Sequence, residues 1–183
     1  MSSYECSEAG GQKAGTCAHG FGFCCHFIFK PDSTAIAIKK KVSYIQNLNF
    51  PVTDFAFVDQ TISLVPLNEN ICQIRLDFLQ FDHGGGSALK NPCEKQRFRF
   101  KNSQGEQMPF RDLCSRNRGQ HLYLPVEDLE LAATIEITTM GNQNQDFGYR
   151  WNIKITQVNK NYNKRKLNLH LSSLTVPTQK KGR

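Results

Sequence analysis

The sequence predicts an all-β protein, an antiparallel sandwich or barrel built from many short strands. Apolar and polar residues alternate with the period of a strand in several segments, and polar, turn-forming segments separate them. No segment has a convincing helical period of about 3.6 residues. With 183 residues and 39% hydrophobic content, the chain is long enough to bury the core of one domain with extensions.

Residues 1–41 are expected to form a leader and a linker ahead of the strand-rich part. The leader runs ECSEAGGQKAGTCAHGFGFCCHF from Glu5, and its many glycines predict no helix of any length. We therefore expect a loop-rich strap that disulfides hold in place. The linker after it is polar, with one short alternating patch at Ile36 and Ile38.

The clearest strand is ICQIRLDFLQFD at residues 71–82, where apolar residues alternate with Arg75 and Asp77. Cys72 has the same parity as the apolar residues, so it is predicted to point inward. The apolar phase then slips by one residue, and a β-bulge near Phe78–Leu79 would explain that slip. This segment predicts a long strand with one face buried.

The remaining candidate strands are shorter, and turn-forming segments such as HGGGS, NSQGE, RNRG and GNQNQD lie between them. The candidates lie near residues 55–58, 61–66, 96–101, 121–125, 129–139 and 149–158. Residues 159–183 lose this alternation and are expected to form a disordered tail.

The formal net charge of +7 comes from that tail rather than from the strand-rich part. Residues 160–183 contain seven of the 23 Lys and Arg and none of the 16 Asp and Glu, so the rest of the chain is neutral (16 against 16). A basic tail allows an anionic partner, but no aromatic and basic platform supports nucleic-acid binding. No apolar run approaches the roughly 18 residues of a membrane span.

Seven cysteines in a strand-rich chain predict disulfides rather than a zinc site. Cys17, His19, Cys24, Cys25 and His26 cluster within ten residues, but their spacing does not match the paired ligands that zinc prefers. Disulfides are typical of extracellular proteins, whereas the first residues do not have the pattern of a signal peptide. We therefore expect the sequence to begin downstream of a missing signal segment.

Several segments, in their order along the chain, resemble a CUB domain, which is a jelly-roll-like sandwich of two antiparallel sheets. YIQNLNFP at 44–51 is similar to the opening turn of the family, residues 71–82 to its central strand, and WNIKI at 151–155 to its closing strand. Cys93 and Cys114 match the cysteines of the second half. The resemblance implies a CUB-like domain over residues 42–158.

A narrower resemblance is to secreted arthropod proteins in which a Gly- and Cys-rich leader with a Cys-Cys pair precedes a CUB domain. It rests on the segments GTCAHGFGFCC, SYIQNLNFP, ICQIRLDFLQFD, NRGQHLY and WNIKITQV, in this order.

The resemblance also carries implications for individual residues. It implies a disulfide between Cys93 and Cys114. The usual first disulfide of the family has no counterpart, because neither Val42-Ser43 nor residues 60–62 contain a cysteine. Calcium-binding members have an Asp where this chain has Gln96, a neutral amide, so calcium binding is not expected.

Sequence alone leaves the other cysteine pairings open. We expect disulfides that attach the leader to the sandwich, with an inward-facing Cys72 paired to Cys24 or Cys25. The cysteines of unknown pairing are Cys6, Cys17, Cys24, Cys25 and Cys72. Because seven is an odd number, at least one cysteine is free or is paired outside this chain.

The function expected from this resemblance is that of a secreted, non-catalytic module that binds an extracellular protein or glycan through its loops. The candidate loops are 83–92, 115–121 and 141–148. No catalytic residue, metal ligand or cofactor is predicted, since the sequence has no G-x-S-x-G element and its five His lie in unrelated surroundings.

Arg97, Arg99 and Lys101 share one face of a candidate strand and form a short basic strip. This strip could bind sulfated glycans or an acidic protein surface, while a solvated strand face is the simpler interpretation. Two other functions stay open: an intracellular basic protein whose tail binds anionic partners, and an accessory-domain fragment of a larger extracellular protease.

Overall fold

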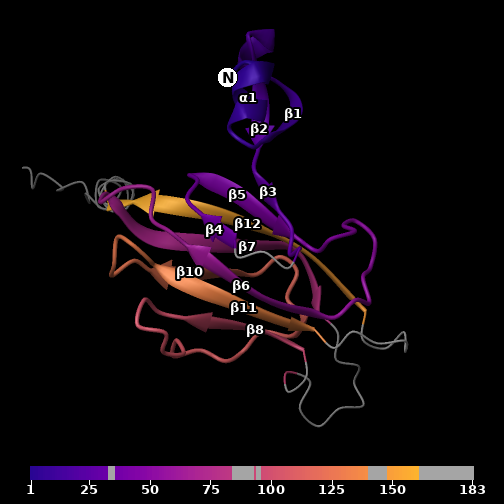
Figure 1. Ribbon diagram of the computed structural model, residues 1–183, viewed down its shortest axis with the longest axis vertical. Coiled ribbons are helices and arrows are strands. Elements are labelled where there is room, and N and C mark those ends of the chain that lie inside the picture. The colour runs from indigo at the N-terminus through magenta and orange to yellow at the C-terminus, as the bar shows by residue number, and fades with distance from the viewer. Residues whose placement is uncertain (33–35, 84–92, 94–95, 140–147, 161–183) are drawn as a thin grey trace, which may run out of the picture.

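The computed structural model describes residues 1–32, 36–83, 93, 96–139 and 148–160, and confirms the all-β prediction (Figure 1). None of the helices among these residues is long and apolar enough to cross a membrane. In chain order the elements are α1 (Ser3–Glu8), β1 (Gln12–Cys17), the 3-10 turn η1 (Ala18–Gly20), β2 (Gly22–His26), β3 (Ile28–Phe29), β4 (Ile36–Ile38), β5 (Val42–Gln46), β6 (Val58–Leu64), β7 (Ile71–His83), β8 (Arg97–Lys101), β9 (Ser115–Arg116), β10 (His121–Pro125), β11 (Ala133–Thr139) and β12 (Tyr149–Asn159).

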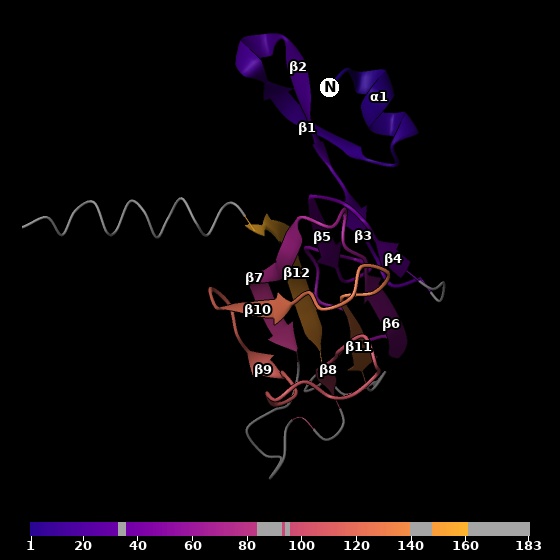
Figure 2. The same ribbon diagram turned by 90° about the vertical axis from the view of Figure 1, so that its left-hand side faces the viewer.

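Two sheets pack face to face, and a hairpin of β1 and β2 stands apart from them (Figure 2). The larger sheet has the order β10-β7-β12-β5-β3, with β9 also paired to β7, and the smaller has the order β4-β6-β11-β8. Pairing is antiparallel except for β3 with β5 and β4 with β6. These two parallel strands are the short segments through which the leader and linker join the sandwich.

The core lies between the two sheets and is built from strands with strict alternation. Along β11, for example, Ile135 and Ile137 are fully buried, and their partners on β8 are Phe100 and Phe98. The Phe98 ring packs edge-on against Trp151 of β12, with centroids 5.4 Å apart, an arrangement favoured by the quadrupoles of the two rings. Aromatic packing therefore compensates for a modest hydrophobic content.

A β-bulge in β7 explains the slip in its apolar phase. Gln80 pairs with Asn152 of β12 and Phe78 pairs with Ile153, so Leu79 has no partner on that strand. Leu79 is 46% exposed, while Phe78 and Phe81 are buried on the core side. The predicted bulge near Phe78–Leu79 is confirmed.

A second bulge near the start of β7 makes the prediction for Cys72 wrong. Ile71 pairs with Asn159 and Gln73 pairs with Val158, so Cys72 is the extra residue. Ile71 takes the buried position, and Cys72 is only half-buried, with its Sγ donating to the Val158 carbonyl at 3.5 Å. Cys72 is a free thiol and does not pair with Cys24 or Cys25.

The leader is more regular than the sequence predicts. A capping box starts α1, because Glu5 N donates to Ser2 Oγ at 3.1 Å and Ser2 N donates to the Glu5 carboxylate at 2.7 Å. This local pairing stabilises a six-residue helix that the glycine content does not predict. Ahead of the sandwich, α1 then packs beside the β1–β2 hairpin.

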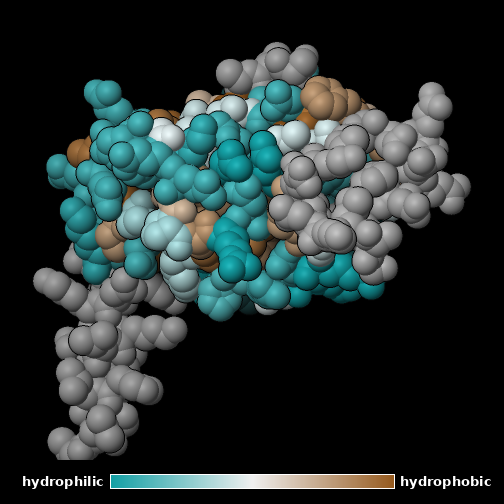
Figure 3. All heavy atoms as spheres, turned by 90° about the horizontal axis from the view of Figure 1, so that it is seen from below, coloured by the Kyte–Doolittle hydropathy of each residue, from teal (hydrophilic) through white to brown (hydrophobic). Residues whose placement is uncertain are grey.

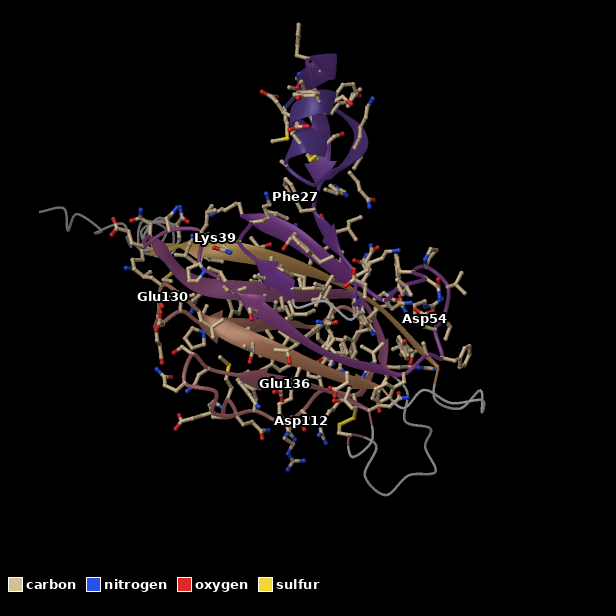
Figure 4. All side chains as sticks on the ribbon, in the orientation of Figure 1. Phe27, Lys39, Asp54, Asp112, Glu130 and Glu136 are labelled. Carbon is tan, nitrogen blue, oxygen red and sulfur yellow. A yellow bond between two sulfur atoms is a disulfide. The ribbon has the colours of Figure 1, made fainter. Side chains whose placement is uncertain are left out.

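Both leader disulfides lie within the leader, so the expected disulfide strap to the sandwich is wrong. Cys6 pairs with Cys25 and Cys17 pairs with Cys24. The leader is instead attached through backbone and side-chain contacts around Phe27, which Figure 4 labels at the junction. Tyr44 N donates to the Phe27 carbonyl at 2.8 Å, and the Lys40 ammonium lies 4.3 Å from the centre of the Phe27 ring.

Candidate functional site

The segment between β5 and β6 is held in place by a buried asparagine. Asn47 is fully buried, and its Nδ2 donates to the Val52 carbonyl at 3.0 Å and to Asp54 Oδ2 at 2.7 Å. Its Oδ1 accepts a hydrogen bond from the backbone N–H of Trp151 at 2.9 Å. One side chain thus joins the start and the middle of the segment to the central strand β12.

Asp54 is the second centre of this network and is 4% exposed. Its carboxylate also accepts from the backbone N–H of Asn49 at 3.0 Å and from the Asn49 side-chain amide. The backbone of Asp54 exchanges two 2.9 Å hydrogen bonds with Tyr149, at the start of β12. Figure 4 labels Asp54 at this end of the sandwich. Amide donors therefore replace the water that an exposed carboxylate would bind.

Tyr149 and Thr139 contact the segment from the buried side. Burial raises the pKa of Tyr149 to about 12, and the negative charge of Asp54 adds to that shift. Thr139 Oγ1 donates to the Ala56 carbonyl at 2.9 Å and accepts from Val58 N at 2.6 Å. The end of β11 and the start of β12 hence fix the exit of the segment as well.

Close packing against Gly148 leaves little freedom to the middle of the segment. A Cβ atom at position 148 would lie 2.7 Å from both the Phe55 ring and the Thr53 methyl group. Real Cβ contacts are longer, so only glycine fits here without a shift of its neighbours.

Four apolar side chains nevertheless stay partly or largely exposed on this fixed backbone. Leu48 is 50% exposed, Val52 64%, Phe55 42% and Phe57 68%. We refer to residues 48–57 as the apolar loop. Single exposed apolar residues are common on soluble proteins, whereas four within ten residues on a fixed backbone make this segment a candidate interaction site. The alternation in the sequence does not reveal this candidate site and predicts a strand near 55–58 instead, whereas β6 begins only at Val58.

The three loops that the sequence predicts as binding loops offer few described contacts. Two of them, 83–92 and 141–148, lie almost entirely outside the described residues. In the third, 115–121, Asn117 Nδ2 donates to the Cys114 carbonyl at 2.7 Å, and the Arg116 guanidinium lies 3.7 Å from Asp82.

His83, the first residue of the candidate loop 83–92, is fully buried in the core rather than placed in a cleft. Its ring packs against Phe98 and Tyr149, and its Nε2 lies 3.2 Å from the Thr138 carbonyl. Burial lowers the pKa of His83 to about 4, while backbone hydrogen bonds with Thr138 and Arg97 oppose the shift.

The basic strip is partly neutralised by two carboxylates. Arg99 makes two hydrogen bonds to Asp112, at 3.1 and 2.8 Å, and Arg97 Nε lies 3.9 Å from the same carboxylate. Lys101 Nζ lies 2.6 Å from Glu136. Seen from below, the described surface is mostly hydrophilic (Figure 3). Anion binding by this strip stays a prediction.

The cysteine pair of the sandwich, Cys93 and Cys114, is joined by a disulfide. It links the segment before β8 to the segment before β9, at the end of the sandwich where β7 ends. The free Cys72 lies at the other end of β7.

The fold is similar to that of known CUB domains. No family model matches the sequence, and the curated proteins give no match. The MASP-1 CUB2 domain bound to Ca2+ is similar in structure, with a TM-score of 0.49 and 11% identity over 66% of this chain and 96% of that chain. The CUB1-EGF-CUB2 domains of rat MASP-1 give a TM-score of 0.51 and 10% identity over 68% of this chain and 43% of theirs. Those of human MASP-1/3 give a TM-score of 0.49 and 11% identity over 80% and 49%.

The sandwich thus has a CUB-like fold, as the family resemblance implied. The chain spans less than half the length of the rat and human multi-domain fragments. The comparisons do not support the narrower resemblance to arthropod proteins.

That calcium does not bind stays a prediction. Gln96 is a neutral amide and is 1% exposed, and the Asp54 carboxylate is already occupied by amide donors from Asn47 and Asn49. In the part of the chain that the structure describes, no group of three His, Cys, Asp or Glu side chains could hold a metal ion. In addition, all three cysteines of the leader cluster of Cys and His residues form disulfides, Cys17 with Cys24 and Cys25 with Cys6.

Proposed function

We propose that this CUB-like chain is an extracellular, non-catalytic module that binds a protein partner through the apolar loop, residues 48–57. The observation that carries the proposal is the combination of four exposed apolar side chains with a buried polar network beneath them. Asn47 and Asp54 hold the backbone, so the loop loses little conformational freedom on binding.

The composition of the loop favours a protein surface over an anionic membrane. Protein interfaces bury aromatic and aliphatic side chains at their centres, and Phe57 and Phe55 supply such groups. Binding to an anionic lipid surface relies on basic groups. A basic residue, Lys30, contacts the loop, and its Nζ donates to the Leu48 carbonyl at 2.7 Å.

An extracellular location is supported by cysteine usage. Six of the seven cysteines form three disulfides, a state that is rare in reducing compartments. A non-catalytic role is supported by the buried polar side chains near the loop. Asn47, Asp54 and Thr139 hydrogen-bond to the backbone or to one another, so they serve to hold the structure. An accessory-domain fragment of a protease fits the same geometry. The alternative of an intracellular protein that binds anions through its basic tail rests mostly on residues 161–183, which lie outside the described residues.

A binding experiment tests this proposal. The full chain is screened against purified extracellular proteins, and each protein that binds is titrated with wild type, Phe57→Ser and Leu129→Ser. Leu129 is also an exposed apolar residue, but it lies ahead of β11, outside the apolar loop. We expect Phe57→Ser to weaken binding at least about tenfold, because an interfacial Phe is worth roughly 1.5–3 kcal/mol. Equal affinity of Phe57→Ser and wild type would overturn the proposal.

A further inference from the structure

The imidazole of His83 lies where the ends of three strands meet beside the apolar loop. His83 is the last residue of β7, between its sheet partners Ser115 of β9 and Tyr149, the first residue of β12. Its Nε2 lies 3.2 Å from the carbonyl of Thr138 near the end of β11, and its ring centroid lies 5.9 Å from that of Tyr149. One buried side chain therefore contacts both β11 and β12 at the ends that lie next to the loop.

The same two strand ends hold the backbone of the apolar loop. Tyr149 exchanges two backbone hydrogen bonds of 2.9 Å with Asp54. Thr139, the last residue of β11, accepts a hydrogen bond from Val58 N at 2.6 Å through its Oγ1. A movement that separates the imidazole from either strand end therefore loosens the loop at its exit.

Aromatic rings and backbone groups surround the imidazole. The rings of Phe81 on β7 and Phe98 on β8 lie 5.9 and 4.7 Å from it, and backbone hydrogen bonds connect it to Thr138 and Arg97. Tyr149 is titratable but stays neutral, because burial raises its pKa to about 12.

Charged side chains of the neighbouring strands are directed away from the imidazole. Arg97 Nε on β8 lies 3.9 Å from Asp112, and Asp82 on β7 lies 3.7 Å from Arg116. The negative charge of Asp54 acts on the Tyr149 hydroxyl. Among the described residues no carboxylate contacts the imidazole, so a proton on its ring would be a buried charge without a counter-charge.

We propose that His83 is a pH-dependent switch, in which protonation of the buried imidazole separates the end of β11 from the start of β12 and releases the apolar loop. An exposed histidine changes its charge between pH 5 and 8, which suits it to this role. Because His83 lies at strand ends, the opening leaves the middle of the sheets intact, including the pair of Ile135 and Phe100. That the release weakens binding to a protein partner rests on the function proposed above.

Acid favours the open form because exposure raises the proton affinity of the imidazole. The pKa of the buried His83 ring is about 4, whereas an exposed histidine has a pKa of about 6.5. Between these values the open form binds the additional proton, so the equilibrium constant for opening rises as the pH falls. With the two values, linkage gives an increase of about 30-fold from pH 7.5 to pH 5.

Hydrogen exchange of the full chain, followed amide by amide by NMR, tests this inference without a partner. The reporting amides are those of Asp54, Val58 and Tyr149, which make the hydrogen bonds described above. At each pH the ratio of the measured to the intrinsic exchange rate gives the constant for opening, and a urea titration gives the constant for global unfolding. In His83→Leu the opening should no longer depend on pH, whereas in His121→Leu, which changes an exposed residue of β10, the dependence should stay.

We expect the opening constant of the three amides to rise about 30-fold between pH 7.5 and pH 5 and to exceed the constant for global unfolding at least about tenfold. An opening constant that does not change with pH would overturn the inference. A value equal to the unfolding constant would overturn it too, because His83 would then act on the whole fold and not on the loop. Both comparisons use wild type, so they decide the question even if His83→Leu does not fold. The expected exchange together with no effect of Phe57→Ser on binding would refute the proposed function and leave the switch in place.

Discussion

Lowering the pH from 7.5 to 5 should destabilise the protein through His83. In the folded state burial holds the pKa of His83 at about 4, whereas an unfolded His titrates near 6.5. Between these values the unfolded state binds more protons, so stability is full above about pH 6.5 and falls as the pH decreases. With these two pKa values, linkage gives a loss of about 2 kcal/mol at pH 5 and about 3 kcal/mol at pH 4.

Urea titrations at several pH values measure this loss, and the fluorescence of the single, fully buried Trp151 reports unfolding. In a His83→Leu variant the slope of stability against pH between 7.5 and 5 should nearly vanish, whatever the absolute stability of the variant. His121→Leu is the control, because His121 is exposed at the start of β10. If wild type and His83→Leu have the same slope, the protein does not contain a buried neutral histidine at this position.

The same urea assay checks three further predictions. Replacing Cys93 and Cys114 together by Ala opens a loop with a sequence separation of 21 and should cost about 3 kcal/mol, and an unchanged midpoint would show that the bridge contributes nothing. Leu76→Ala should cost about 2–5 kcal/mol because Leu76 is fully buried, whereas Leu79→Ala on the same strand should stay within about 0.5 kcal/mol; similar costs would argue against the bulge. Asn47→Ala removes three hydrogen bonds and should cost about 3 kcal/mol, and a loss below about 1 kcal/mol would mean that the apolar loop is not held as described.

Much of the sandwich follows from local pattern. The alternation in β7, β8, β11 and β12 is a direct consequence of burying one face of each strand, so their positions could be predicted from the sequence. The bulge at Leu79 was predictable for the same reason. When the apolar alternation shifts by one residue within a strand, a β-bulge keeps the apolar side chains on the buried face. The position of Cys72 was predicted wrongly because the second bulge leaves no trace in the pattern of apolar residues. Its extra residue, Cys72, is itself apolar, so the alternation continues in the sequence.

The candidate site could not be predicted by the same means. Phe55 and Phe57 alternate with small residues and resemble a strand, yet they are exposed because Asn47 and Asp54 fold the preceding segment back on β12. That fold depends on hydrogen bonds to Tyr149 and Trp151, about 100 residues further along the chain, so no local pattern contains it. In the sequence, only the polar residues around Phe50-Pro51 indicate that this segment is a loop rather than a strand.

Counting free thiols in the native protein tests most directly whether this is a disulfide-braced extracellular module. The protein is alkylated with iodoacetamide in denaturant, with and without prior reduction, and its mass is measured. We predict one adduct without reduction, on Cys72, and seven after reduction. Seven adducts without reduction would contradict the account, because all cysteines would then be reduced in the native protein and the case for an extracellular binding module would fail.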